Sequence, residues 1–225
     1  MRRSRTLPVL TTLGLLGAGF AGAVIAPAAA ADDMPIISVA GSFNSEIGCG
    51  GDWQPDCVEA QLTYDAASGL YIGEFDIPVP ADGEQYEYKY TQDGGWDVNW
   101  GQFGVVGADN IKLDVNPSGL TTFIFQPPAE VGGNAQVVAG ATDTMYRAVG
   151  DMQTFFGCTD VWTPDCFKSV LFPQADGTLS RTTTAIDTGS YQFKIVRANA
   201  WVNAYTWGLN GGSPGDNIPF STNTG

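Results

Sequence analysis

The chain contains the block GSFNSEIGCGGDWQPDC from Gly41 to Cys57 and the block GDMQTFFGCTDVWTPDC from Gly150 to Cys166. The offset between them is constant at 109 positions, and both blocks carry a Gly-Cys step followed by Trp-x-Pro-Asp-Cys. Identity at such different residue types in one register is not expected by chance. The chain is therefore predicted to contain an internal duplication.

The similarity between the two copies resumes further along the chain. The matching segments are YEYKY (Tyr86–Tyr90) with YQFKI (Tyr191–Ile195), WDVNWG (Trp96–Gly101) with WVNAYTWG (Trp201–Gly208), and ADNI (Ala108–Ile111) with GDNI (Gly215–Ile218). We expect one module at residues 34–127 and a second at 134–225, joined by a Pro/Gly-rich linker at 128–133.

The second copy ends where the first continues into LTTFIF (Leu120–Phe125). Three explanations stay open at this point: a final strand is dispensable, another segment such as Ala135–Ala139 fills the edge, or the chain is truncated.

The first copy reads as a series of short strands separated by Gly, Pro and Asp turns. The candidates are Ile36–Ala40, Ala60–Tyr64, Leu70–Ile77, Gln85–Thr91, Asn110–Val115 and Leu120–Phe125. The three tyrosines of YEYKYT fall on one strand face and Lys89 on the other. Beyond the N-terminal region, helical periodicity is suggested only at Thr142–Val149. The pattern predicts an all-β fold of two tandem immunoglobulin-like β-sandwich modules.

The N-terminus has the features of a cleaved signal peptide at residues 1–31. Three arginines precede an apolar stretch from Leu7 to about Ile25, and the alanine run Ala28–Ala31 offers a cleavage site. An uncleaved membrane anchor is the alternative. No later stretch is long and apolar enough to span a bilayer. We expect a secreted, extracellular protein with no membrane association after cleavage.

Charge and composition exclude several functions. The formal net charge is −14, and loss of the three N-terminal arginines makes it −17. So acidic a surface repels nucleic acid and anionic polymers, whereas a neutral polymer meets no such repulsion. The chain has no histidine, which removes the commonest general base and metal ligand. We expect no cofactor and no metal.

The four cysteines form two pairs, each eight positions apart. In an exported protein this spacing predicts the disulfides Cys49–Cys57 and Cys158–Cys166. A zinc site is the alternative, although the short Cys spacing usual in zinc sites is absent.

The motifs DWQPDC and WDVNWG, with LTYD, YEYK and DNI, resemble the immunoglobulin-like accessory modules beside the catalytic barrel of bacterial pullulanases and amylopullulanases. They also resemble starch-binding modules of outer-membrane starch-utilisation lipoproteins. The similarity covers nearly all of the first copy and about two-thirds of the second. It implies a β-sandwich in an α-glucan context, without the catalytic barrel.

Every tryptophan lies in a repeated motif. A sugar ring has apolar faces and a hydroxyl rim, so aromatic side chains stack on it while polar groups orient it. The candidate ligand-binding residues are Trp53, Lys89, Trp96, Asp97, Asn99 and Trp100 in the first copy, and Trp162, Lys194, Trp201, Asn203 and Trp207 in the second. A buried structural role is the alternative for each tryptophan, and a solvated ion pair for each lysine.

The acidic residues are scattered through turns, whereas glycosidases need two carboxylates at a defined separation. We therefore predict a non-catalytic protein that binds α-glucan, with a secreted amylase or pullulanase as a further expected partner. The alternative is a module or inhibitor that binds another secreted protein.

Overall fold

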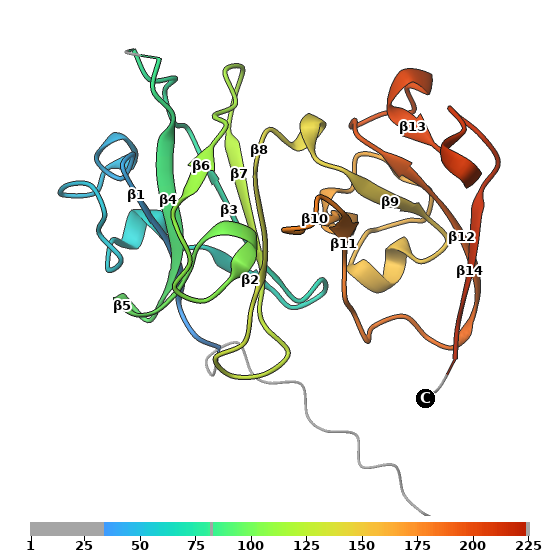
Figure 1. Cartoon of the computed structure of the whole chain (residues 1–225), viewed down its shortest axis with the longest axis horizontal. Helices are drawn as coiled ribbons and strands as arrows, with labels where there is room; N and C mark the ends of the chain where they lie inside the picture. Colours follow the sequence, from blue (N-terminus) through green and yellow to red (C-terminus); the bar gives the residue numbers. More distant parts are fainter. Residues whose placement is uncertain (1–33, 82, 224–225) are drawn as a thin grey trace, which may run out of the picture.

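The structure is a computed structural model that describes residues 34–81 and 83–223 (Figure 1). In this part of the chain the regular structure is antiparallel β-sheet with short 3₁₀ turns, which confirms the all-β prediction. The predicted signal peptide lies outside the described residues. No helix in the described ranges has the length and apolar character needed to cross a bilayer.

The first copy is a sandwich of two four-stranded sheets. Outer sheet 1 consists of β1 (Ile37–Gly41), β4 (Tyr86–Gln92), β5 (Gly95–Trp100) and β6 (Ile111–Leu113). Inner sheet 1 consists of β2 (Thr63–Asp65), β3 (Leu70–Phe75), β7 (Thr121–Gln126) and β8 (Gln136–Gly140). In β4 the alternation puts Tyr88 and Tyr90 between the two sheets, against Phe123 and Phe125 of β7.

The second copy repeats the outer sheet with the same register. Outer sheet 2 consists of β9 (Arg147–Gly150), β12 (Gly189–Val196), β13 (Thr206–Trp207) and β14 (Ile218–Thr222). Gly41 faces Tyr88 in the first copy, and Gly150 faces Phe193 in the second. The duplication seen in the sequence is therefore also a duplication of strand pairing.

The inner sheet is not repeated in full. Inner sheet 2 contains the short strands β10 (Phe172–Pro173) and β11 (Leu179–Ser180), which occupy the positions of β2 and β3. Tyr88 and Tyr90 are 1% and 0% exposed, whereas their counterparts Phe193 and Ile195 are only partly buried. The second core lacks the aromatic cover that β7 provides in the first.

Two segments differ from the sequence-based expectations. The stretch 142–149, suggested as helical, forms a single 3₁₀ turn at Thr142–Thr144 followed by β9, because Arg147–Gly150 pairs along β12. The segment 135–139, considered as an edge for the second copy, instead contributes β8, which pairs with β7. Other 3₁₀ turns lie at Ser45–Ile47, Val58–Ala60, Gln102–Gly104, Gln153–Phe156, Phe167–Ser169, Asn203–Tyr205 and Leu209–Gly211.

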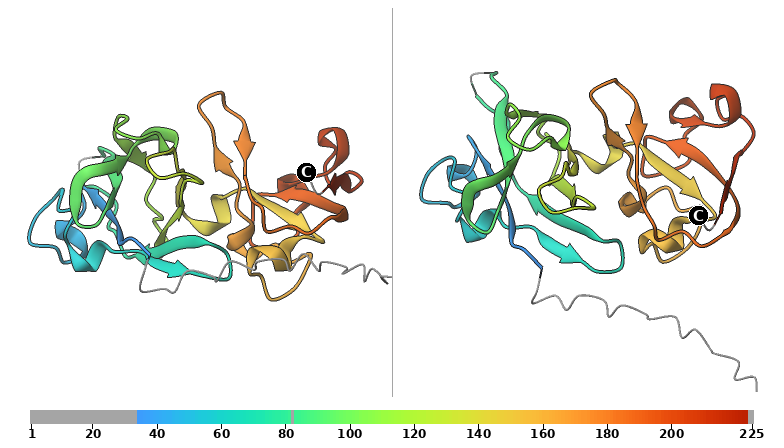
Figure 2. Two further views of the ribbon diagram at one scale, coloured as in Figure 1. Left: turned by 90° about the horizontal axis from the view of Figure 1, so that it is seen from below. Right: turned by 60° about the horizontal axis from the view of Figure 1, so that its bottom comes forward.

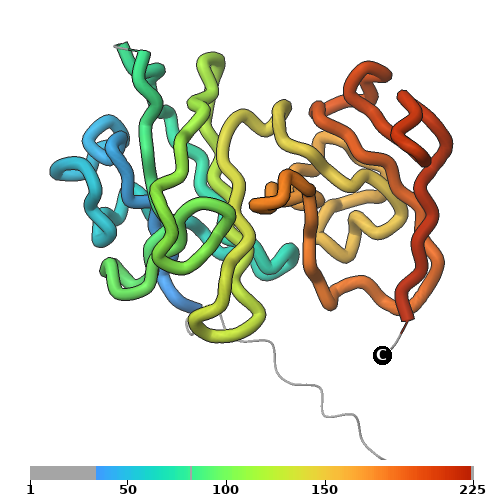
Figure 3. Tube along the Cα trace, in the orientation of Figure 1, coloured from blue at the N-terminus to red at the C-terminus, as the bar shows by residue number. Residues whose placement is uncertain are grey.

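The two copies pack back to back through the outer face of inner sheet 1 (Figures 1, 2 and 3). Leu70 and Ile124 on that face are fully buried against Val170 and Phe172 from the β10 region. The sheets therefore lie in the order outer sheet 1, inner sheet 1, inner sheet 2, outer sheet 2.

Polar contacts fix this arrangement at the rim of the apolar cluster. Lys168 Nζ lies 2.9 Å from the Asp65 carboxylate, which is the one ion pair in the described part of the chain. The Gln126 side chain donates to Thr182 O at 2.6 Å, and Thr182 N donates to the Gln136 side chain at 3.1 Å. These contacts join both edge strands of inner sheet 1, β2 and β8, to the second copy.

Candidate functional site

Each disulfide loop begins where the first strand of its outer sheet ends in glycine. A Cβ atom on Gly41 would lie 2.6 Å from Glu87 O, and one on Gly150 would lie 2.1 Å from Gln192 O. Both distances are shorter than any real Cβ contact, so only glycine allows the loop to leave the sheet at this point.

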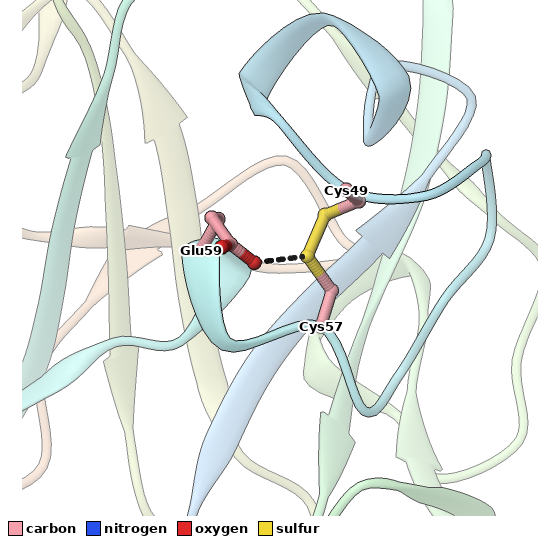
Figure 4. Close-up of side chains that lie close together, drawn as sticks. All are labelled: Cys49, Cys57 and Glu59. Carbon is pink, nitrogen blue, oxygen red and sulfur yellow. Dashed lines mark hydrogen bonds between the residues drawn. A yellow bond between two sulfur atoms is a disulfide. The ribbon is translucent and has the colours of Figure 1, made fainter.

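Both predicted disulfides are present, Cys49–Cys57 with a Cα separation of 5.7 Å and Cys158–Cys166 with 5.9 Å. Figure 4 shows the Glu59 carboxylate beside the first of them, with Oε2 3.2 Å from Cys57 Sγ. A disulfide sulfur carries no proton to donate and no thiolate charge to bind a metal. The alternative of a zinc site therefore does not apply to these cysteines.

A buried amide braces each loop, a feature that the sequence analysis missed. Asn44 Oδ1 accepts from Gly41 N at 2.9 Å and Gln54 N at 3.2 Å, and its Nδ2 donates to Val39 O at 3.0 Å. Gln153, the residue equivalent to Asn44, is also fully buried. An amide side chain at the same position in both copies, directly after the apolar residues Phe43 and Met152, is the signal that could have identified this pair.

The Gln153 amide makes the corresponding contacts in the second loop. Thr163 N donates to Gln153 Oε1, and Gln153 Nε2 donates to Thr163 O, both at 2.8 Å. Nε2 also donates to Ser169 Oγ at 3.1 Å. Each amide thus holds its loop to the residue that follows the loop tryptophan.

Tryptophans from two separate segments meet in each copy. The first tryptophan pair is Trp53 from the disulfide loop and Trp96 from β5, with ring centroids 6.3 Å apart and planes inclined by 40°. The second tryptophan pair is Trp162 and Trp201, with 6.2 Å and 32°. Trp96 is 41% exposed and Trp201 is 47% exposed, so each pair presents an aromatic surface to solvent.

The loop tryptophans adopt an uncommon backbone conformation. Trp53 and Trp162 both have φ of 57°, in the left-handed region that bulky residues avoid. The cost of such a conformation is about 1–3 kcal/mol, and it occurs preferentially at functional sites. Both copies keep a tryptophan at this position despite that cost.

The second pair has an additional constraint. Trp162 Nε1 donates to Asp151 Oδ1 at 2.7 Å, and Asp151 Oδ2 accepts from Gln192 N at 2.9 Å. Ser42 stands at the equivalent position in the first copy, where its hydroxyl accepts from Glu87 N at 3.1 Å. The carboxylate therefore orients the ring of Trp162 in a way that Ser42 does not reproduce for Trp53.

The two predicted lysines lie on the outer faces of the outer sheets. Lys89 Nζ donates to Asn99 Oδ1 at 3.2 Å, and Asn99 Nδ2 donates to Trp96 O at 2.9 Å, so the lysine is linked to the first pair. Lys194 Nζ donates to Pro214 O at 3.2 Å and also to Gly215 O. Neither lysine forms an ion pair with a described carboxylate, contrary to the solvated ion-pair alternative.

The second pair borders a surface pocket of about 460 Å³. Its lining combines the second tryptophan pair with Lys194, Asn203, Thr206, Pro214 and Asn217. Asn203 is exposed, as is Asp97 beside the first pair. The pocket thus offers aromatic faces next to amide and ammonium groups.

Two of the six tryptophans do not join these pairs. Trp100 is 2% exposed, packs against Phe125 at 4.9 Å, and donates through Nε1 to Gly133 O at 3.0 Å. A ring buried in this way has no face for a ligand, which corrects the inclusion of Trp100 among the binding candidates. Trp207 is its counterpart and is partly buried against Tyr146, with ring centroids 5.9 Å apart.

The fold and the site define a pair of β-sandwich modules, each with an aromatic surface beside a disulfide loop. The sequence model of the pullulanase X25 domain matches residues 36–131 and 145–225. The chain belongs to this family, which confirms the resemblance to accessory modules of pullulanases.

Similar proteins extend well beyond this chain. Amylopullulanase of Thermoanaerobacterium saccharolyticum is 27% identical over 215 residues, which cover 95% of this chain and 16% of that protein. Amylopullulanase of Thermoanaerobacterium thermosulfurigenes is 26% identical over 214 residues, covering 94% and 11% respectively. The pullulanase from Bacillus acidopullulyticus aligns in structure with 73% of this chain and 28% of its own, at 12% identity and a TM-score of 0.34.

Proposed function

We propose that this protein binds α-glucan polysaccharide at the two tryptophan pairs and does not itself cleave it. The observation that carries the proposal is the recurrence, in both copies, of an exposed tryptophan inclined to a second tryptophan held by a disulfide loop. Stacking on sugar faces needs exposed, preorganised aromatic rings. The strained φ of Trp53 and Trp162 supports a selected ring position.

The inclination of the rings favours an α-linked chain. A β-1,4-glucan is a flat ribbon that suits coplanar rings, whereas an α-1,4-glucan turns at each residue and suits inclined ones. The planes of the two rings are inclined by 40° in the first pair and by 32° in the second. Lys89 and Asn99, or Lys194 and Asn203, would bond the hydroxyl rim, since these groups lie beside the rings.

The absence of catalysis is part of the proposal. Glycosidases place two carboxyl groups about 5–10 Å apart across a cleft. Here Asp52 accepts hydrogen bonds from Ser45, and Asp151 accepts from Trp162 and Gln192, so both carboxylates brace loops. The net charge of −14 also suits a neutral ligand. The protein would act outside the cell, beside a separate amylase or pullulanase.

Native electrophoresis in gels containing amylopectin, pullulan, hydroxyethylcellulose or no polysaccharide tests this proposal. We expect retardation in the two α-glucan gels only. Trp96→Ala and Trp201→Ala should each weaken binding at their own site about 30-fold, from the roughly 2 kcal/mol lost when a central aromatic contact is removed. The double variant should migrate as in the gel without polysaccharide.

Phe103→Ala is the matched control, because Phe103 is 41% exposed like Trp96 but lies outside both pairs. Retardation of the double variant equal to that of the wild type would reject the site assignment. Equal mobility of the wild type in every gel would reject the ligand class and favour a secreted protein partner. Release of reducing sugar by the purified protein would show that it is an enzyme after all.

A further inference from the structure

The two tryptophan pairs lie on surfaces that face away from each other. In β4, Tyr88 and Tyr90 point toward inner sheet 1, so Lys89 between them points to the opposite side, away from the rest of the molecule. Lys89 is joined through Asn99 to Trp96, which places the first pair at this outer surface.

The second pair lies on the outward face of outer sheet 2. Phe193 of β12 packs in the core between outer sheet 2 and the β10 region, together with Leu171 and Phe156. Lys194, the next residue, therefore points outward, and it lines the same pocket as Trp162 and Trp201. Figures 1 and 2 show the two outer sheets at opposite ends of the molecule, with the inner sheets between them.

The separation between the sites is large and fixed. Stacked sheets pack about 10 Å apart, so four layers place the two outer sheets roughly 30 Å apart. The contact between the copies is held by the buried cluster around Leu70 and Phe172 and by the Lys168–Asp65 pair. Gly157 adds a close approach, since a Cβ there would lie 2.8 Å from Ala67 C.

A single glucan segment cannot reach both sites without passing around the whole molecule. Two sites strengthen binding to one chain only when the geometry allows both to engage it together. We propose that the protein instead bridges two separate glucan chains, or two distant branches of one polymer, as a rigid bivalent cross-linker. This inference rests on the proposed function of the two pairs.

Light scattering from mixtures of the protein with soluble glycogen or amylopectin tests the bridging. We expect scattering to rise and then fall as the ratio of protein to polymer increases, because excess protein occupies every chain with one site only. Trp96→Ala and Trp201→Ala, each keeping one working pair, should still be retarded in the polysaccharide gel but should lose at least nine-tenths of the scattering increase. Maltoheptaose in excess should reverse the scattering.

The outcomes separate the bridging from the binding itself. Wild-type protein that is retarded in gels but never raises scattering would overturn the bridging and leave glucan binding intact. A single-site variant that scatters like the wild type would also overturn it, provided that sedimentation shows both proteins to be monomers. Loss of all retardation in one single-site variant would show that the other pair does not bind, which again excludes bridging. Wild-type protein that is not retarded at all would reject the proposed function.

Discussion

Replacing Asn44 with alanine tests whether the buried amide holds the first disulfide loop. The substitution removes three hydrogen bonds at 2.9, 3.2 and 3.0 Å and leaves Gly41 N, Gln54 N and Val39 O without their partner. A buried polar group left unpaired costs about 1–3 kcal/mol. Some of this cost is recovered if water enters the vacated space. We therefore expect the free energy of unfolding to fall by about 3 kcal/mol.

Urea denaturation followed by far-ultraviolet circular dichroism, with the disulfides intact, measures this change. Ser45→Ala is the control, because Ser45 is a neighbouring exposed residue whose hydroxyl bonds only to the surface residues Glu46 and Asp52. It should cost less than about 1 kcal/mol. Gln153→Ala should behave like Asn44→Ala in the second copy. An Asn44→Ala protein within about 0.5 kcal/mol of the wild type would refute the bracing role.

Two further predictions concern pH and oxidation state. Burial raises the pKa of Tyr88 and of Tyr90 above the usual value, so these phenols stay neutral in the folded protein while they ionise near pH 10 in the unfolded chain. The free energy of unfolding should therefore fall as pH rises above 10, and Tyr88→Phe should flatten this slope in denaturation curves between pH 8 and 11; an unchanged slope would contradict the assignment. Replacing Cys49 and Cys57 by serine should lower stability by about 2–3 kcal/mol in thermal unfolding. It should also weaken glucan retardation more in a Trp201→Ala background than in a Trp96→Ala background, and equal losses would contradict the link between this loop and the first pair.

Local patterns in the sequence predicted both disulfides and most strands of the first copy, although β5 was not among the predicted strands. YEYKYT gave β4 within one residue, since strict alternation of aromatic and polar residues is a local property. The disulfides followed from spacing and duplication. Trp96 is 41% exposed and follows Gly94 and Gly95, which mark a turn.

Long-range packing decided what the sequence did not reveal. Trp100 is buried because Phe125 and Gly133, both far along the chain, enclose its ring. The pairing of β8 with β7 likewise depends on tertiary structure, because β8 joins the copy in which the edge of β7 is free to pair. Trp53 and Trp96 lie more than forty residues apart in the sequence and meet only in the folded protein. The repeat shows only that each copy contains both tryptophans. Periodicity and spacing carry no information about such contacts.

The left-handed conformation of Trp53 and Trp162 implies a trade-off between stability and activity. Glycine would adopt a φ of 57° without strain, so it is the residue that a selection for thermal resistance alone would favour at these two positions. An engineered chain improved in this way would tolerate heat better and would lose the indole surface. Thermostability screens of these modules should therefore retain a ligand-capture step.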